Sequence, residues 1–204
     1  APMHEALHDL ADENDRLIIL AAIEFGKSNQ ISIMRTLHQL GQDTSLRVAI
    51  VSNTARQSEK LLKTIKRYIE SSAELHYVFP ELRPSPDNWT NNAITVRRRT
   101  LSKDPSVQAL GIHGSILGSR IDLLVIDDLL DVENTHSAKA REDCFAWLQA
   151  TCLSRLTNEA RVIVIGTPFH PDDALHRLAR LPGWKAVRYP VVDEEYGVVM
   201  SFAR

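Results

Sequence analysis

Short apolar runs alternate along the chain with longer segments in which apolar residues recur at helical spacing. Runs such as DLLVID and RVIVIG are apolar at consecutive positions, which is typical of central strands covered by helices on both faces. The pattern predicts strands at 17–22, 47–52, 93–97, 122–126, 161–165 and 185–189. It predicts helices at 27–40, 54–71, 137–156 and 172–181. This alternation of strands and helices indicates a three-layer α/β domain with a mostly parallel sheet.

The alternation is weaker between residues 74 and 118. The stretch FPELRPSPDNW is rich in proline and is predicted to be a loop, and 91–118 has room for a hairpin and a glycine-flanked loop. After Tyr189 the chain becomes acidic and shows no further helical pattern. We therefore expect one domain over residues 1–190 and an acidic linker over 191–204.

Composition narrows the class of protein. The 24 Lys and Arg residues against 26 Asp and Glu exclude a uniformly basic nucleic-acid-coating protein, although not a local basic patch. No apolar run approaches the roughly 20 residues that span a bilayer, and no signal peptide is evident, so a soluble protein is expected. Cys144 and Cys152 lie about 12 Å apart along a predicted helix, too far for a disulfide. Reduced thiols in a cytoplasm are the simplest interpretation.

The stretch LIILAAIEFGKSNQIS has the layout of a phosphate-binding loop. Such a loop needs a strand, a tight turn and a helix N-terminus, with a lysine for the phosphates and a hydroxyl for Mg²⁺. Gly26, Lys27 and Ser28 supply the turn, while Ala21 replaces the first glycine of G-x-x-x-x-G-K-[ST]. Because alanine disfavours positive φ, that end of the loop must take an ordinary backbone conformation. Taken alone, GKS is equally compatible with an ordinary helix start.

A second motif follows about a hundred residues later. IDLLVIDDLLD places Asp127 and Asp128 directly after an apolar strand, as in a Walker B motif. The first acid would support the Mg²⁺ shell beside the phosphate loop, and the second would orient or deprotonate the attacking water. Strands also end in capping aspartates for structural reasons, but the two motifs together predict nucleoside triphosphate binding.

These motifs, taken with others, resemble a known family. AAIEFGKSNQIS, GSRIDLLVIDDLLDVENTHS, FAWLQATCLSRL and VIVIGTPFHPDDALHRL resemble the N-terminal ATPase domain of the large terminase subunits of tailed bacteriophages, over roughly residues 17–190. The resemblance implies a P-loop NTPase of the additional-strand, RecA-like (ASCE) class, which hydrolyses ATP with Mg²⁺ to drive double-stranded DNA into a procapsid. It also implies a portal protein, a small terminase subunit and a ring of identical subunits as partners, in the host cell cytoplasm.

The resemblance assigns roles by position. Asp128 and Arg120 would be catalytic, the arginine acting on a neighbour's ATP, where such a finger is worth ~10³-fold or more in rate. Gly166 and Thr167 would form the coupling motif, and Ser28 and Asp127 would hold Mg²⁺. The expected ATP and phosphate contacts are Ala21, Glu24, Phe25, Gly26, Lys27, Ser28 and Asn29.

The chain also departs from the family pattern. Ile23 stands where many relatives carry an arginine, so a phosphate contact from the loop is lost. Asp128 stands where many relatives use glutamate, which is one methylene longer. The nuclease domain of the family is not recognised, and the contiguous acids 193–195 fit a solvated linker, so no nuclease activity is expected.

Two further groups of residues have both a structural and a functional interpretation. The basic residues of 54–71 form one helix face, which is either a solvated surface or a track for the DNA backbone, and a second basic cluster follows near residue 98. The candidate DNA contacts are Arg56, Lys60, Lys63, Arg67, Arg97, Arg98 and Arg99. FHPDDALHRL resembles a metal site only weakly, and a helix start at Pro171 and Asp172 is favoured.

Two other functions remain open from the sequence. One is a different DNA-dependent ATPase, such as a helicase or recombinase core, although a helicase needs a second RecA-like lobe. The other is a non-enzymatic module that binds nucleotide to set its shape during assembly.

Overall fold

The computed structural model describes residues 2–21, 26–98, 100, 102–116, 120–189, 192–193 and 197–198. Its strands are β1 (Arg16–Ala21), β2 (Val48–Ser52), β3 (Pro84–Trp89), β4 (Ala93–Val96), β5 (Val107–Gly111), β6 (Ile121–Asp127), β7 (Leu156–Gly166), β8 (Lys185–Tyr189), β9 (Val192–Asp193) and β10 (Gly197–Val198). Its helices are α1 (Pro2–Glu13), η1 (Ser28–Arg35), α2 (Thr36–Gln42), α3 (Ala55–Ser71), α4 (Ala73–Val78), α5 (Ala138–Trp147), η2 (Leu148–Cys152), η3 (Leu153–Arg155) and α6 (Ala174–Ala179). In the described residues, no helix is long and apolar enough to cross a membrane.

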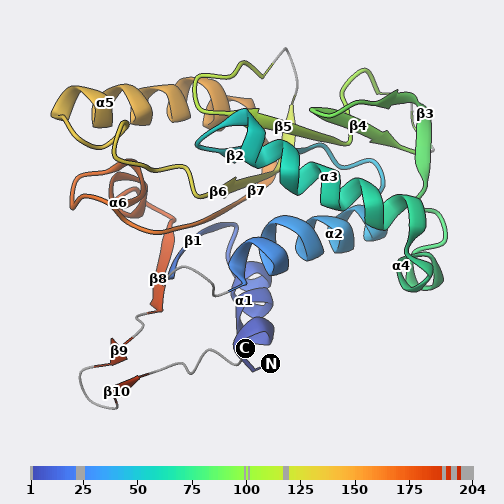
Figure 1. The fold of residues 1–204 in the computed structure, drawn as a ribbon, viewed down its shortest axis with the longest axis horizontal. Coiled ribbons are helices and arrows are strands. Elements are labelled where there is room, and N and C mark those ends of the chain that lie inside the picture. Colours follow the sequence, from blue (N-terminus) through green and yellow to red (C-terminus); the bar gives the residue numbers. More distant parts are fainter. Residues whose placement is uncertain are drawn as a thin grey trace.

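The main sheet has the strand order β3-β4-β5-β2-β6-β7-β1-β8 (Figure 1). Every pairing from β5 to β8 in this order is parallel, whereas β3 pairs with β4, and β4 with β5, in the antiparallel sense. The predicted α/β architecture with a mostly parallel sheet is therefore confirmed. One strand, β7, lies between β1 and β6, the two strands that carry the candidate motifs.

Helices cover both faces of the sheet, which explains the unbroken apolar runs of its central strands. In β1, the side chains of Leu17 and Ile19 belong to a core shared with α1, η1, α2 and α3. Those of Ile18 and Leu20 belong to a second core, shared with α5, η2 and α6. All four side chains are buried, so each strand position faces a helix layer (Figure 1).

Helix α3 matches its prediction closely. Thr54 and Gln57 form a capping box at its start, in which each side chain bonds the backbone of the other residue. Leu62, Ile65 and Ile69 are buried along one face. The opposite face carries the basic stripe, whose four residues are all exposed: Arg56, Lys60, Lys63 and Arg67.

The structure differs from the sequence prediction in several segments. The proline-rich segment predicted as a loop contains β3, an edge strand, where the missing N–H of proline is tolerated. Helix α1 was not predicted, and Arg35 anchors it to η1 by donating to the carbonyls of His8 and Ala11 and to Asp12. The segments predicted as single helices at 27–40 and 137–156 each contain a π-helical stretch, η1 and η2.

Candidate active site

Three parallel strands bring the candidate residues to one edge of the sheet. Leu20 pairs with Gly166 across β1 and β7, and Asp127 pairs with Ile165 across β6 and β7. The carboxyl ends of the three strands therefore lie side by side. Ala21, the last residue of β1, is extended and buried, as the missing glycine requires. Carboxyl edges of open parallel sheets are where ligands of α/β proteins bind.

The two coupling candidates connect these strand ends. Gly166 closes β7, and a Cβ built on it would lie 3.6 Å from Asp128 Oδ1. The hydroxyl of Thr167 donates to the carbonyl oxygen of Ala21 at 3.4 Å. Gly166 and Thr167 thus contact both the strand before the phosphate loop and the second acid of the Walker B segment.

The glycine and lysine of the phosphate loop open a helix. Gly26 has φ +69°, a left-handed conformation that favours glycine, and its carbonyl accepts from the Gln30 backbone N–H at 3.0 Å. Lys27 precedes η1 and is only 5% exposed, with its Nζ 4.0 Å from Asp128 Oδ1. Asn29 is exposed in the first turn. The helix N-terminus with a buried ammonium group is suited to binding phosphate oxygens. Glu24, Phe25 and Ile23 lie outside the described residues.

Two serines of η1 hold the carboxylate of Asp127. Ser28 Oγ donates to Asp127 Oδ1 at 3.0 Å, and Ser32 Oγ donates to Asp127 Oδ2 at 2.6 Å. Ser32 is fully buried, and Asp127 is 3% exposed. The sequence prediction identified Ser28 and Asp127 but missed Ser32. Its signal was present in SNQIS, because residues four apart share one helix face.

The electrostatics of Asp127 reflect its burial. Desolvation raises the pKa of Asp127 to about 6, and the charge of Asp128 acts in the same direction. The hydrogen bonds from Ser32 and Ser28 and the charge of Lys27 act to lower it. A cation bound beside Asp127 would therefore lower its pKa and favour the ionised carboxylate.

The donor set around Asp127 fits Mg²⁺. This ion prefers oxygen ligands, keeps several waters, and is bound by one or two protein groups together with substrate phosphates. The Ser28 hydroxyl and the Asp127 carboxylate supply such oxygens 3.0 Å apart, beside the loop. The described residues contain no group of three or more His, Cys, Asp or Glu side chains that would form a metal cage by themselves.

Asp128 has an unusual backbone conformation. Its φ is +47°, and its side chain is 51% exposed. Its N–H donates to the carbonyl of Ile165 at 3.0 Å, and its own carbonyl accepts from the Asn53 N–H at 3.2 Å. These two bonds fix the strained residue between β7 and the end of β2. Its carboxylate stays accessible beside Lys27.

Arg120 lies far from the strand ends just described. It is exposed and directly precedes β6, whereas Asp127 ends the same strand. A strand of this length separates the two by about 20 Å. Its backbone N–H donates to Asp104 Oδ2 at 3.4 Å. Within one subunit, Arg120 therefore does not approach Asp127.

The candidate DNA contacts are in different environments. Four of them are exposed on α3: Arg56, Lys60, Lys63 and Arg67. Arg97 is exposed as well, and Arg99 lies outside the described residues. Arg98 is half-buried, and its guanidinium donates to Ser106 Oγ and to the carbonyl of Asp104. Bonds within the chain therefore occupy Arg98, which supports a structural role.

The segment FHPDDALHRL forms a helix cap. The predicted helix started at Asp172, whereas α6 begins two residues later, at Ala174. Asp173 is its N-cap and accepts from the backbone N–H groups of Phe169, His170 and His176. Its carboxylate also bonds His176 Nδ1 at 2.9 Å.

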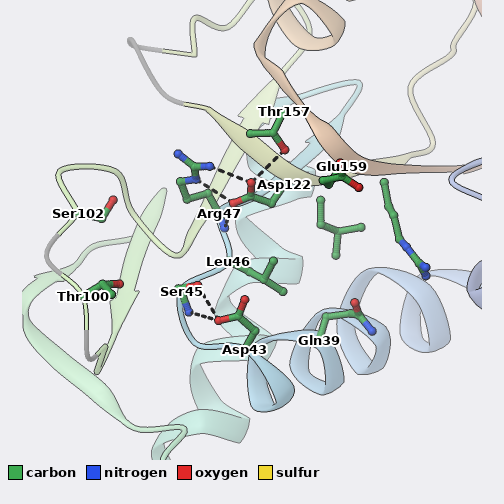
Figure 2. A pocket seen from close by; sticks show the side chains of 12 residues that line it. Gln39, Asp43, Ser45, Leu46, Arg47, Thr100, Ser102, Asp122, Thr157 and Glu159 are labelled. Carbon is green, nitrogen blue, oxygen red and sulfur yellow. Dashed lines mark hydrogen bonds and ion pairs between the residues drawn. The ribbon is translucent and has the colours of Figure 1, made fainter.

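A polar cavity of about 440 Å³ lies at the opposite edge of the sheet. Figure 2 shows Arg47 and Asp122 at its wall, joined by a bidentate ion pair at 2.8 Å, with Thr157 donating to Asp122. These residues stand at the amino ends of β2, β6 and β7. The cavity is therefore separate from the phosphate loop, and the ion pair serves to join strand ends.

Comparisons with known proteins find similar sequences and similar folds. The chain is 30% identical over 182 residues to the large terminase subunit of Enterobacteria phage T3, covering 88% of this chain and 30% of that protein. A mutant ATPase domain of the large terminase of Thermus phage P74-26 has a TM-score of 0.54 at 12% identity, covering 91% of this chain and 79% of the other. A second structure of that ATPase domain has a TM-score of 0.50 at 15% identity, covering 81% and 64%. No family model matches the chain.

The mostly parallel sheet and its helix layers have the fold of a P-loop ATPase domain of the α/β class. The relative in phage T3 places this similarity with large terminase subunits, and the two similar structures from Thermus phage P74-26 are ATPase domains of such a subunit. The present chain spans about 30% of the length of the phage T3 protein.

Proposed function

We propose that this chain binds ATP with Mg²⁺ and hydrolyses it to drive double-stranded viral DNA into a procapsid. One observation carries the proposal: Lys27 and Ser28, which follow the loop glycine, lie close to Asp128 and Asp127 at the end of β6. Two further observations support the same conclusion. The sheet is mostly parallel, with these residues at the carboxyl ends of its strands, and the chain is similar to a large terminase subunit.

The proposed mechanism divides the work among named side chains. Among the described residues, Ala21, Gly26, Lys27, Ser28 and Asn29 are assigned the contacts with the triphosphate, and the buried Lys27 ammonium neutralises phosphate oxygens. Ser28 and Asp127 would hold Mg²⁺, which when bound supplies positive charge to the phosphates. Asp128 orients the attacking water, and its exposed carboxylate suits that role. Gly166 and Thr167 transmit changes in the bound nucleotide to β1 and β7.

The remaining catalytic group comes from a neighbour. Arg120 lies at the amino end of β6, away from the ATP site of its own subunit. We therefore propose that it reaches the ATP of the next subunit in a ring. The ring would assemble on the procapsid with a portal protein and a small terminase subunit, in the host cell cytoplasm. The proposal assigns DNA contacts to the exposed basic residues of α3 and to Arg97, and it assigns no nuclease activity to this chain.

The test is nucleotide binding and turnover by the 204-residue chain. Lys27→Ala should abolish ATP binding in the presence of Mg²⁺, while Lys139→Ala, an exposed lysine on α5, should leave binding unchanged. Arg120→Ala should leave ATP affinity unchanged and remove the turnover that rises with protein concentration. Unchanged ATP affinity in Lys27→Ala would overturn the site. ATP left intact at every protein concentration, with DNA present, would favour a non-enzymatic assembly module.

A further inference from the structure

Asn53 connects the second Walker B acid to the basic helix. It follows the last residue of β2 and precedes Thr54, the N-cap of α3. Its backbone N–H donates to the Asp128 carbonyl at 3.2 Å, and its side-chain Nδ2 donates to Asp131 Oδ2 at 2.5 Å. Its Oδ1 accepts from Asn134 Nδ2 at 3.2 Å. A single half-buried side chain thus bonds both arms of the loop that follows β6.

That loop is closed by hydrogen bonds between its own residues. The Asp131 N–H donates to Asn134 Oδ1 at 3.1 Å, and the Asn134 N–H donates back to Asp131 Oδ1 at 2.9 Å. Asn134 Nδ2 also donates to the carbonyl of Leu129 at 3.0 Å. These reciprocal bonds close residues 129–134 into one unit, so a displacement of Asp128 moves the partners of Asn53 together.

On its other side, Asn53 is continuous with α3. The Ile112 N–H donates to the carbonyls of both Ser52 and Asn53, at 3.1 and 3.2 Å. The capping box of Thr54 then begins the helix, whose exposed face carries the basic stripe. Only Thr54, the N-cap, therefore separates Asn53 from Ala55, the first residue of α3. The bond to Asp128 comes from the Asn53 backbone, whereas the Asn53 side chain ties the helix start to Asp131 and Asn134 in the loop that follows Asp128.

We propose that Asn53 is a positioning residue that couples nucleotide state at Asp128 to the position of α3 and hence to its grip on the DNA backbone. The inference rests on the proposed function, because it assumes that ATP binds beside Asp128 and DNA binds α3. Occupation of the ATP site shifts Asp128, the bonded loop carries Asn53 with it, and the start of α3 follows. The relevant quantity is a coupling free energy between two sites, which must be reciprocal.

The experiment measures that coupling in the 204-residue chain. The affinity for a short DNA duplex is measured with and without a non-hydrolysable ATP analogue and Mg²⁺, and the analogue affinity with and without DNA. We expect the two ligands to change each other's affinity by the same factor, about fivefold or more. In Asn53→Ala this factor should fall to nearly one, while each ligand bound alone keeps its affinity within about threefold.

Two further variants keep the inference falsifiable. Asn134→Ala removes the opposite partner and should uncouple the sites as well, and the double variant should be no worse than either single one, because both residues act in one network. Asn158→Ala, an exposed asparagine in β7, is the matched control and should keep full coupling. Thermal unfolding verifies that each variant is folded.

The outcomes separate the inference from the function on which it rests. Failure of the unmodified chain to bind the analogue or DNA would contradict the proposed function. Binding of both ligands without mutual effect, or full coupling in folded Asn53→Ala and Asn134→Ala, would overturn the role of Asn53 alone.

Discussion

The Ser32 hydroxyl lies 2.6 Å from Asp127 Oδ2, on the side of the carboxylate opposite the bond from Ser28. The two serines are four residues apart in the π-helical η1, which begins directly after the phosphate loop. π-Helical turns are rare and are found frequently at functional sites. Here the wide turn lets one helix hold both oxygens of the acid. Ser32 therefore fixes the orientation in which Asp127 would meet a metal ion.

Ser32→Ala should lower turnover without removing ATP binding. A hydrogen bond to a charged group contributes about 1.5–3 kcal/mol, so kcat/KM for ATP should fall by about ten- to a hundredfold. The measurement is steady-state hydrolysis with Mg²⁺, together with ATP affinity. Ser58→Ala, a buried serine on α3 that bonds the backbone of Ala55, is the matched control. Equal rates in the two variants would contradict a positioning role for Ser32.

Asp127→Asn should stabilise the metal-free protein above about pH 6. In the folded chain, burial raises the pKa of Asp127 from 3.8 to about 6. A raised carboxyl pKa means that the folded state gains stability from protonation at low pH, and that this gain is lost as the pH rises through about 6. Near pH 7.5 the ionised carboxylate costs on the order of 3 kcal/mol, which the neutral amide avoids.

Denaturant unfolding in the presence of a chelator measures this difference. The variant should be the more stable protein at pH 7.5, and the advantage should vanish near pH 4. It should also lose ATP hydrolysis, since the amide cannot replace the carboxylate in a metal shell. An advantage that is the same at both pH values would contradict the burial argument.

Much of the fold followed from periodicity because the central strands and α3 are strongly patterned. Leu17–Leu20 is apolar at every position and is buried on both faces, and α3 separates its apolar and basic faces cleanly. Edge strand β3 could not be predicted because its prolines are compatible with an edge only once the neighbouring strand is known. The apolar spacing of 27–40 predicts an ordinary helix and carries no signal for the π-helical form of η1.

The candidate site was predictable where a motif fixes both residue type and spacing. Gly26, Lys27 and Asp127 belong to such motifs, and the sheet brings them to one edge. Ser32 and Asn53 have no motif of their own, because their importance comes from partners about a hundred and about eighty residues away. Arg98 was grouped with its basic neighbours, although its partners, Ser106 and Asp104, are visible only in the folded chain.

Removing two lysines from the basic stripe of α3 should weaken DNA binding and make the affinity less dependent on salt concentration. Each lysine that neutralises a phosphate contributes about −0.9 to the slope of log K against log salt, so Lys60→Ala/Lys63→Ala should reduce the slope by about two. Lys139→Ala/Arg155→Ala removes two exposed cations elsewhere and is the control. Binding should be measured to duplexes of unrelated sequence, with equal losses expected because backbone contacts do not read bases. An unchanged slope would favour a solvated surface.

Asp173→Asn should destabilise the chain, and the effect should disappear in acid. Burial alone would raise the pKa of Asp173, but the backbone N–H groups of His176, His170 and Phe169 donate to its carboxylate and hold the pKa below its usual value. A depressed pKa contributes stability that is present above the unfolded value of 3.8 and is lost as the pH falls through the lower folded value.

The amide keeps a single acceptor oxygen where the carboxylate uses both, so the loss at neutral pH should be about 1–3 kcal/mol. Urea unfolding near pH 7 and again below pH 4 measures it. Asp172→Asn is the control, since Asp172 is a partly exposed acid paired with Arg177 and Arg180, and such surface pairs contribute little to stability. A loss in Asp173→Asn that persists unchanged in acid would show that geometry, and not charge, makes the cap stabilising.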